Sequence, residues 1–135
     1  MRFVDTNVLL YAISNDPTEI EKAERANEIL ESRDLALSVQ VLQEFYVQAT
    51  RESRPDPLTH EQAVGLAESF LRFPVQAIDV ALTRAAFASR DHFRISYWDA
   101  AIIEAARALG CAVLLSEDLS HGRDFSGVQV ENPFR

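Results

Sequence analysis

The sequence has almost no cysteine, little glycine and no excess of basic residues. Its single cysteine, Cys111, lies in the apolar run CAVLL, which indicates a core residue rather than a disulfide or a metal ligand. The lack of disulfides fits a reducing, cytoplasmic setting. With 13 Lys and Arg against 21 Asp and Glu, the formal net charge is -8. That balance disfavours broad, sequence-independent binding to phosphates.

Long apolar runs and clustered histidines are also missing. No run approaches the roughly 20 residues that a membrane-spanning helix needs, so we expect no membrane association. Zinc is disfavoured because the three histidines, His60, His92 and His121, are scattered and the cysteine is alone. A chain of 135 residues can bury a sizeable core, and we expect residues 1–135 to form a single domain.

Short apolar runs alternate with amphipathic segments along the chain. The runs RFV, LALS, PVQAI, AVLLS and VQVE predict strands, and apolar residues at helical spacing predict helices between them. The segment SEDLSHGRDFSG is expected to be a polar loop. Polar residues at capping positions mark the helix starts, at Thr18 with Glu21, Thr59 with Gln62, Asp79 and Ser96. This alternation predicts a three-layer α/β/α domain with a mainly parallel sheet of about five strands.

Three acidic residues are expected near the carboxyl ends of parallel strands, which is where folds of this class bind their ligands. Asp5 follows the first strand and Asp118 follows the fourth, although a helix cap and a turn residue explain them equally well. Glu44 lies on the polar arc of the helix after the second strand, and taken alone it is better explained as a solvated surface residue. Because that helix starts at the carboxyl end of its strand, we expect it to bring Glu44 to the same edge.

Asp99 distinguishes better between a structural and a functional role. Its spacing from Ser96 fits a capping box, but the helical stripe that it occupies is otherwise apolar, so it should face packed structure. A buried ionised carboxylate is costly without a partner, and no nearby base in the sequence supplies one, since Arg107 is better placed to pair with Glu104. A divalent cation is the simplest counter-charge. Four carboxylates suit hard, oxygen-preferring ions such as Mg²⁺ or Mn²⁺.

Four motifs, in order along the whole chain, carry a resemblance to a known family. VDTNVLLY at the start, the acid in QEFYV, YWDAAIIEAA on a late helix and LLSEDL after the fourth strand resemble the PIN-domain ribonucleases. The resemblance is specifically to the VapC-type toxins of type II toxin–antitoxin pairs. By this resemblance the acidic cluster and its supporting polar residues are Asp5, Glu44, Asp99 and Asp118, with Asn7 and Ser116.

The resemblance implies a Mg²⁺-dependent endoribonuclease that cleaves RNA with a metal-activated water and leaves a 5′-phosphate and a 3′-hydroxyl. Because Mg²⁺ keeps several waters, two or three direct carboxylates suffice for one ion. Asp5 and Asp99 are the first choice, and Glu44 and Asp118 would hold waters or a second ion.

The resemblance also implies two protein partners, a cognate antitoxin and a second copy of the chain in a homodimer. We expect an antitoxin segment in an apolar groove left by the helices after Thr18 and over Val39–Ala49, with an Arg or Lys reaching the carboxylates.

Two other functions stay open at this point. A phosphoryl-transfer domain of the receiver or phosphatase type also places aspartates at strand ends. It needs an acidic pair or a second aspartate two residues after Asp5, where this sequence has Asn7. A catalytically silent module that keeps only the PIN fold is disfavoured by the intact acidic set. A metal-dependent nuclease assay separates the three.

The sequence leaves two details of the site undecided. Glu117 adjoins Asp118, and either acid can face the site, although the strand period of two places Ser116 and Asp118 on one side. Six basic residues lie in segments that can flank the edge of the sheet: Arg51, Arg54, Arg90, His92, Arg94 and Arg123.

Overall fold

The computed structural model describes residues 1–135 and has six strands and six α-helices, with a pair of α-helices after each of the first three strands. The strands are β1 Arg2–Val4, β2 Leu35–Ser38, β3 Val75–Gln76, β4 Val113–Leu115, β5 Asp124–Phe125 and β6 Val128–Glu131. The helices are α1 Thr6–Ala12, α2 Ile20–Leu30, α3 Val39–Ala49, α4 His60–Phe70, α5 Val80–Phe93 and α6 Tyr97–Ala108, with a 3-10 helix η1 at Pro17–Glu19. None of the helices has the length and apolar character needed to cross a membrane.

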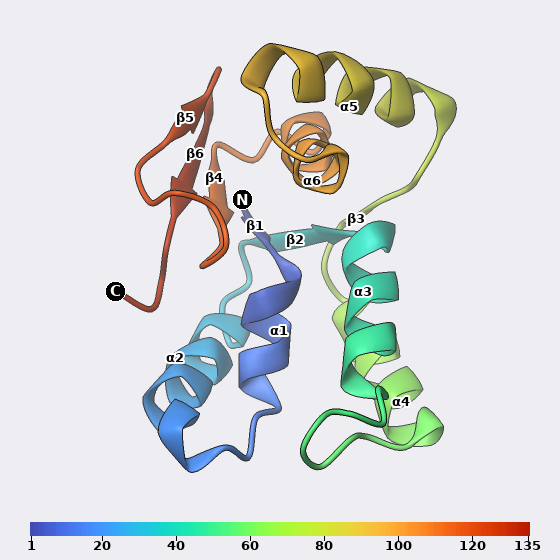
Figure 1. Cartoon of the computed structure of the whole chain (residues 1–135), viewed down its shortest axis with the longest axis vertical. Coiled ribbons are helices and arrows are strands. Elements are labelled where there is room, and N and C mark those ends of the chain that lie inside the picture. The colour runs from blue at the N-terminus through green and yellow to red at the C-terminus, as the bar shows by residue number, and fades with distance from the viewer.

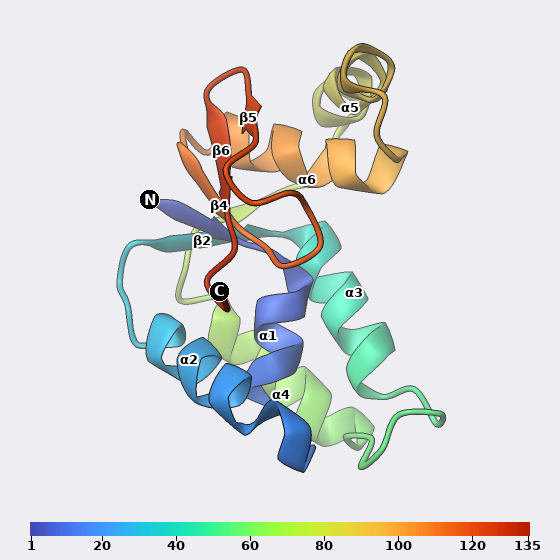
Figure 2. The ribbon, with the colours of Figure 1, turned by 60° about the vertical axis from the view of Figure 1, so that its left-hand side comes forward.

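The elements form three layers around one sheet. Helices α1 to α4 lie on one side of it and α5 and α6 on the other, and both ribbon views agree on this (Figures 1 and 2). The strand order is β3-β2-β1-β4-β6-β5, and every pairing is parallel except that of β5 with β6. The predicted α/β/α architecture with a mainly parallel sheet is therefore confirmed.

The order of the strands reverses at β1. Strands β2 and β3 lie on one side of β1, and β4 lies on its other side. Phe3 of β1 therefore pairs with both Ala36 of β2 and Leu114 of β4. The Asp5 amide extends this pairing by donating a 3.0 Å hydrogen bond to Leu115 O. In parallel α/β sheets, ligands bind at such a reversal, outside the carboxyl ends of the strands.

The core holds these strand ends firmly. Both faces of the sheet are covered by helices, which is why all four residues of β2, Leu35–Ser38, are buried. In β1, Phe3 and Val4 are also buried, and Leu115 of β4 is 1% exposed. Each large apolar side chain buried in this way contributes about 1.5–3 kcal/mol. Asp5 therefore projects from one of the most constrained parts of the chain.

Three predicted helix starts are confirmed, and one is wrong. Thr59 and Gln62 form a capping box, and Asp79 and Ser96 cap their helices through their side chains. Thr18 does not cap α2, because the Asp16 side chain accepts from the Thr18 amide and caps η1 instead. The α2 helix then continues from η1 at Ile20 without a side-chain cap.

The segment SEDLSHGRDFSG is not entirely a loop, and the sheet consequently has six strands rather than about five. Residues Asp124–Phe125 form β5 and pair antiparallel with β6 through a tight turn. Gly127 supplies the positive φ of 102° in that turn, a conformation that glycine adopts without strain. Phe125 is fully buried, so its side chain anchors the strand. A single apolar residue in a polar stretch gave no periodic signal.

Candidate active site

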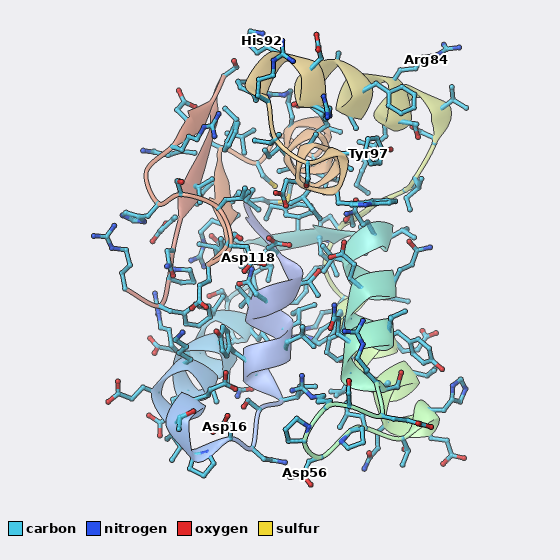
Figure 3. The ribbon with its side chains drawn as sticks, viewed as in Figure 1. Asp16, Asp56, Arg84, His92, Tyr97 and Asp118 are labelled. Atoms are coloured by element: carbon cyan, nitrogen blue, oxygen red, sulfur yellow. The ribbon has the colours of Figure 1, made fainter.

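A cleft of about 270 Å³ lies at the carboxyl ends of β1 and β4, beside α1, α3 and α6. All four predicted acids line it, together with six other residues: Thr6, Asn7, Leu10, Gln48, Trp98 and Ile102. The lining contains no Lys, Arg or His, so none of the six basic residues considered from the sequence lines the cleft, although Arg54 donates to the backbone oxygen of the lining residue Leu10 at 3.5 Å. Figure 3 shows His92 on α5, well away from Asp118 near the start of α1.

Asp5 has a structural role and a place in the cleft at the same time. Its side chain caps α1, with Oδ1 accepting from the Thr6 amide at 2.8 Å, and Oδ2 accepts from the Ser116 hydroxyl at 2.7 Å. Asp5 is 6% exposed, and burial raises its pKa to about 6, with the charges of Asp118 and Glu44 adding to the effect. The two hydrogen bonds oppose that rise without cancelling it.

Asn7 and Ser116 connect the two strand ends. The Asn7 amide nitrogen donates to Ser116 Oγ and to Asp118 Oδ2, both at 3.2 Å, and Asn7 Oδ1 accepts from the Glu117 amide. Ser116 Oγ also accepts from the Asp118 amide at 3.1 Å. These hydrogen bonds join two segments that are distant in sequence. Ser116 contacts Asp5, and Asp118 contacts Asn7, each across a separation of 111 residues.

Glu44 reaches the cleft from α3 and is held there by two residues that sequence reasoning missed. The Thr6 hydroxyl donates to Glu44 Oε2 at 2.7 Å, and Gln40 Nε2 donates to Oε1 at 2.9 Å. Thr6 and Gln40 are both buried. A signal for Gln40 exists, because it precedes Glu44 by one helical turn on the same polar arc. The only sequence signal for Thr6 is its position inside the DTN motif.

Asp99 lies in the first turn of α6, whose N-cap Ser96 accepts a hydrogen bond from the Asp99 amide at 3.1 Å. Its side chain is half-buried beside the other acids. Burial raises its pKa, and the nearby charges of Asp118 and Glu44 raise it further. The predicted pairing of Arg107 with Glu104 is confirmed at 3.0 Å, so no base from α6 neutralises Asp99.

Glu117 turns away from the cleft, which answers the question that the sequence left open. The Tyr11 hydroxyl donates to one of its oxygens at 2.6 Å, and Lys22 donates to the other at 2.8 Å. Burial opposes ionisation of Glu117, but these two hydrogen bonds and the Lys22 charge outweigh it and lower the pKa. Asp118 is the acid that lines the cleft. No sequence signal joins Glu117 to Tyr11 or Lys22, because the contact is long-range.

The donor set of the cleft fits a hard divalent cation. It offers carboxylate, amide and hydroxyl oxygens and no competing positive charge. No group of three or more His, Cys, Asp or Glu side chains converges as it stands on a single metal position. Mg²⁺ does not require such convergence, because it retains several waters and binds through one or two carboxylates.

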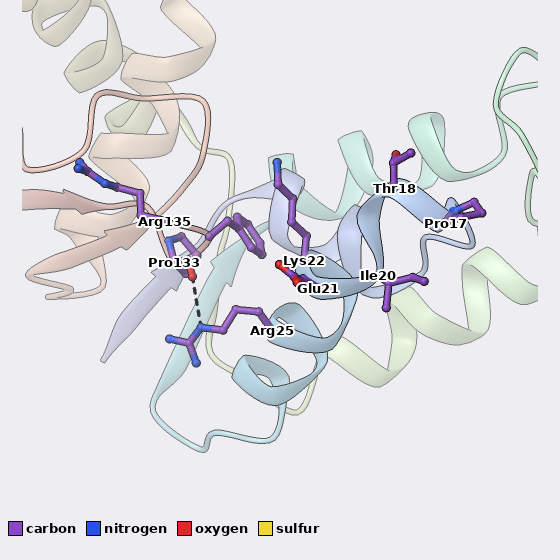
Figure 4. A pocket seen from close by; sticks show the side chains of 9 residues that line it. Pro17, Thr18, Ile20, Glu21, Lys22, Arg25, Pro133 and Arg135 are labelled. Atoms are coloured by element: carbon purple, nitrogen blue, oxygen red, sulfur yellow. Dashed lines mark hydrogen bonds between the residues drawn. The ribbon is translucent and has the colours of Figure 1, made fainter.

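A larger cavity lies elsewhere and has a different character. It measures about 700 Å³ between α2 and the C-terminal residues, and Arg25 Nε donates to Pro133 O across it at 3.3 Å (Figure 4). Its polar residues carry charges of both signs, among them Glu21, Lys22 and Arg135. Size alone would favour this cavity, whereas the chemistry of the side chains favours the acidic cleft.

The class of protein follows from the family comparison. The family description "PIN domain" matches residues 2–123, a span that includes all four acids and both strand ends. The chain belongs to the PIN-domain family.

Particular solved structures share the fold over nearly the whole chain. A toxin–antitoxin complex from Klebsiella pneumoniae has a TM-score of 0.70 and 20% identity, covering 98% of both chains. DNA-bound VapBC from Salmonella typhimurium has a TM-score of 0.66 and 22% identity, covering 98% of this chain and 97% of that one. VapC20 of Mycobacterium tuberculosis, described as a sarcin–ricin loop cleaving toxin, has a TM-score of 0.66, 21% identity and coverages of 87% and 92%. No curated protein sequence matches the chain.

Proposed function

We propose that this chain is a Mg²⁺-dependent endoribonuclease and the toxin of a toxin–antitoxin pair. The observation that carries the proposal is one cleft lined by Asp5, Glu44, Asp99 and Asp118 with no cation among its residues. Membership of the PIN family supports it, as does the fold shared with the toxins named above.

Asp5 and Asp99 are the carboxylates that we assign to the first ion, Mg²⁺ or alternatively Mn²⁺. Glu44 and Asp118 would hold its waters or a second ion. When bound, the metal supplies an activated water and stabilises the charge that develops on a phosphodiester. The raised pKa values of Asp5 and Asp99 are consistent with a site that is short of positive charge.

The other side chains of the site position the acids. Thr6 and Gln40 fix both oxygens of Glu44, while Asn7 and Ser116 fix Asp118 and Asp5. Ser116 is fully buried and donates its proton to a carboxylate, so it is no covalent nucleophile. Water therefore attacks phosphorus directly. The P–O3′ bond breaks, the 3′ oxygen takes up a proton, and the products carry a 5′-phosphate and a 3′-hydroxyl.

The test is cleavage of RNA by the purified chain, free of any partner, in Mg²⁺ or in EDTA. We expect cleavage only with metal, and loss of most activity in Asp99→Asn. Glu117→Gln is the matched control, because this acid lies next to Asp118 in sequence but outside the cleft. Full activity in EDTA, or equal losses in both variants, would contradict the assignment. The same assay rejects the silent binding module and the phosphoryl-transfer domain if cleavage is seen.

We further propose that an antitoxin segment binds along α2. A groove of about 650 Å³ there is lined by the exposed Ile20, by the partly buried Ala23 and by Glu24, Glu28 and Glu31. No residue of Val39–Ala49 lines it, although the sequence led us to expect that helix as its second wall. A basic amphipathic helix complements such a surface. Co-expression with the neighbouring small gene is expected to give a stable complex without nuclease activity. Recovery of only free, nontoxic protein would count against an antitoxin partner.

We also infer that residues 1–135 act as one domain and that two copies associate. Val80 and Phe87 on α5 are 65% and 60% exposed, which leaves an apolar surface for a second copy. The mass of the protein in solution, measured by light scattering, should be that of a dimer. The mass of one chain at all concentrations would exclude the homodimer.

A further inference from the structure

One aromatic ring at the cleft has no partner in the core. Trp98 is the only tryptophan of the chain, it lines the acidic cleft, and 65% of its surface is exposed. It directly precedes Asp99 in the first turn of α6. Large aromatic side chains usually gain their stabilisation from burial, so an exposed indole beside four carboxylates points to a ligand that covers it.

The backbone and the ring of Trp98 are both held in place. Its carbonyl accepts a 3.2 Å hydrogen bond from Nε2 of the buried Gln40, the same nitrogen that donates to Glu44. The ring meets Tyr97 edge to face, with centroids 5.0 Å apart, and Tyr97 packs in turn against Phe87 at 5.6 Å. Figure 3 shows Tyr97 between α5 and α6. These contacts anchor the backbone of Trp98 next to Glu44 and support one side of its ring.

The charge of the cleft restricts how a nucleic acid can be held there. No Lys, Arg or His lines it, and the Arg54 guanidinium donates only to the backbone oxygen of the lining residue Leu10, at 3.5 Å. The labelled basic residues His92 and Arg84 lie along α5, away from Asp118 (Figure 3). Stacking of a base on an aromatic ring needs no positive charge and tolerates any sequence. An exposed, fixed indole is therefore the feature of this cleft best suited to hold a nucleotide.

We propose that Trp98 is a platform on which one base of single-stranded RNA stacks, next to the phosphodiester that is cleaved. The proposal rests on the ribonuclease function proposed above and narrows its substrate class. A base inside a duplex has no free face to offer, so the substrate must have an unpaired base at the cleavage point. Trp98 binds substrate in this arrangement and transfers no proton.

The first test uses the fluorescence of Trp98, which reports this position alone because no other tryptophan is present. A single-stranded RNA is titrated into the full-length Asp5→Asn protein with Mg²⁺, so that cleavage does not intervene. We expect saturable quenching by the single strand. The same strand in a perfect duplex, or with abasic positions throughout, should quench far less.

The second test is kinetic and uses the active protein. Trp98→Ala should raise KM about tenfold with a smaller effect on kcat, the size expected for loss of one stacked base. Trp98→Phe should restore most of the affinity, because it retains a ring. Leu71→Ala is the matched control, since its side chain is 50% exposed but does not line the cleft, and its KM should equal that of the wild type.

Each other outcome is decisive. A wild-type KM in Trp98→Ala, or equal quenching by single strand and duplex, overturns the proposal. A third result would also overturn it: Trp98→Ala has the KM of the wild type, but its mass in solution falls to that of one chain. The ring would then be a contact between two copies. If the wild type cleaves no RNA but single strands still quench, the ribonuclease function fails and the Trp98 platform stands.

Discussion

Asp5 shows how one side chain can serve both the fold and the site. It ends a buried strand, caps the following helix and accepts a hydrogen bond from Ser116. The position is unfavourable for an ionised group, and its pKa of about 6 against an ordinary 3.8 measures that cost. A residue needed only as a cap would be served as well by an uncharged side chain such as Ser or Asn. The retained charge therefore indicates a purpose beyond capping.

The pKa of Asp5 predicts how stability depends on pH in the metal-free protein. Between about pH 4 and 6 the native chain keeps a proton that the unfolded chain has released, so this group makes folding less favourable as pH rises through that window. Asp5→Asn lacks the effect. In EDTA, the unfolding free energy of the wild type should fall relative to Asp5→Asn by on the order of 2 to 3 kcal/mol between pH 4 and 7. Urea unfolding measures it, and a pH-independent difference would contradict the assignment.

Metal binding should release the same proton. Without metal, Asp5 keeps this proton up to about pH 6 because burial and the charges of Asp118 and Glu44 raise its pKa. We therefore expect Mg²⁺ binding to tighten as pH rises from about 5 to 7 and then to level off. Calorimetric titration in buffers of different ionisation enthalpy counts the protons released. No release in that range, together with full activity in EDTA, would refute the metal site.

At the scale of elements, the caps of two neighbouring helices separate stability from activity. Ser96 caps α6, which carries Asp99, and Asp79 caps α5, which carries no cleft residue. Ser96→Ala and Asp79→Ala should each lower the unfolding free energy by about 1 kcal/mol. Only Ser96→Ala should also lower kcat, because it loosens the turn that holds Asp99. Thermal unfolding and RNA cleavage measured on both variants check this, and equal activities would argue against it.

Elements specified by local signals could be predicted from the sequence, and elements specified by distant contacts could not. The starts of α4, α5 and α6 are set by side chains that bond to amides three residues later, and all three were predicted. Strand β5 depends on burial of Phe125 against the rest of the core, and its short polar surroundings concealed it. Thr18 was predicted wrongly as a cap because Asp16 starts a 3-10 helix two residues earlier and accepts from the Thr18 amide, which places Thr18 inside that turn.

The same division applies to the cleft. Asp5, Asp99 and Asp118 could be placed because each follows a predicted strand or opens a predicted helix, and Glu44 because its helix starts at the carboxyl end of a strand. Parallel strands bring those points together. The supporting contacts were harder to predict, since Thr6 meets Glu44 and Lys22 meets Glu117 across separations of 38 and 95 residues. A single sequence carries no record of which distant polar residues become neighbours.

At the scale of the whole molecule, the net charge of -8 predicts a weak dependence of RNA binding on salt. Binding that relies on stacking and on metal releases few counterions from the strand. A plot of log affinity against log salt should have a slope shallower than about −2, which corresponds to roughly three phosphate contacts on a single strand. Fluorescence titration at several KCl concentrations and constant Mg²⁺ measures the slope. A much steeper value would reveal a basic surface that takes part in binding.

The pairing of β1 with β4 also sets when the cleft can assemble during folding. Asp5 and Asn7 donate to or accept from Ser116 and Asp118 across separations of 111 residues. Contacts between residues so distant in sequence are slow to form, because a long stretch of chain must close before they are made. A chain in which β4 has not yet docked on β1 therefore carries no assembled cleft. The proposed nuclease activity can begin only when that docking is complete.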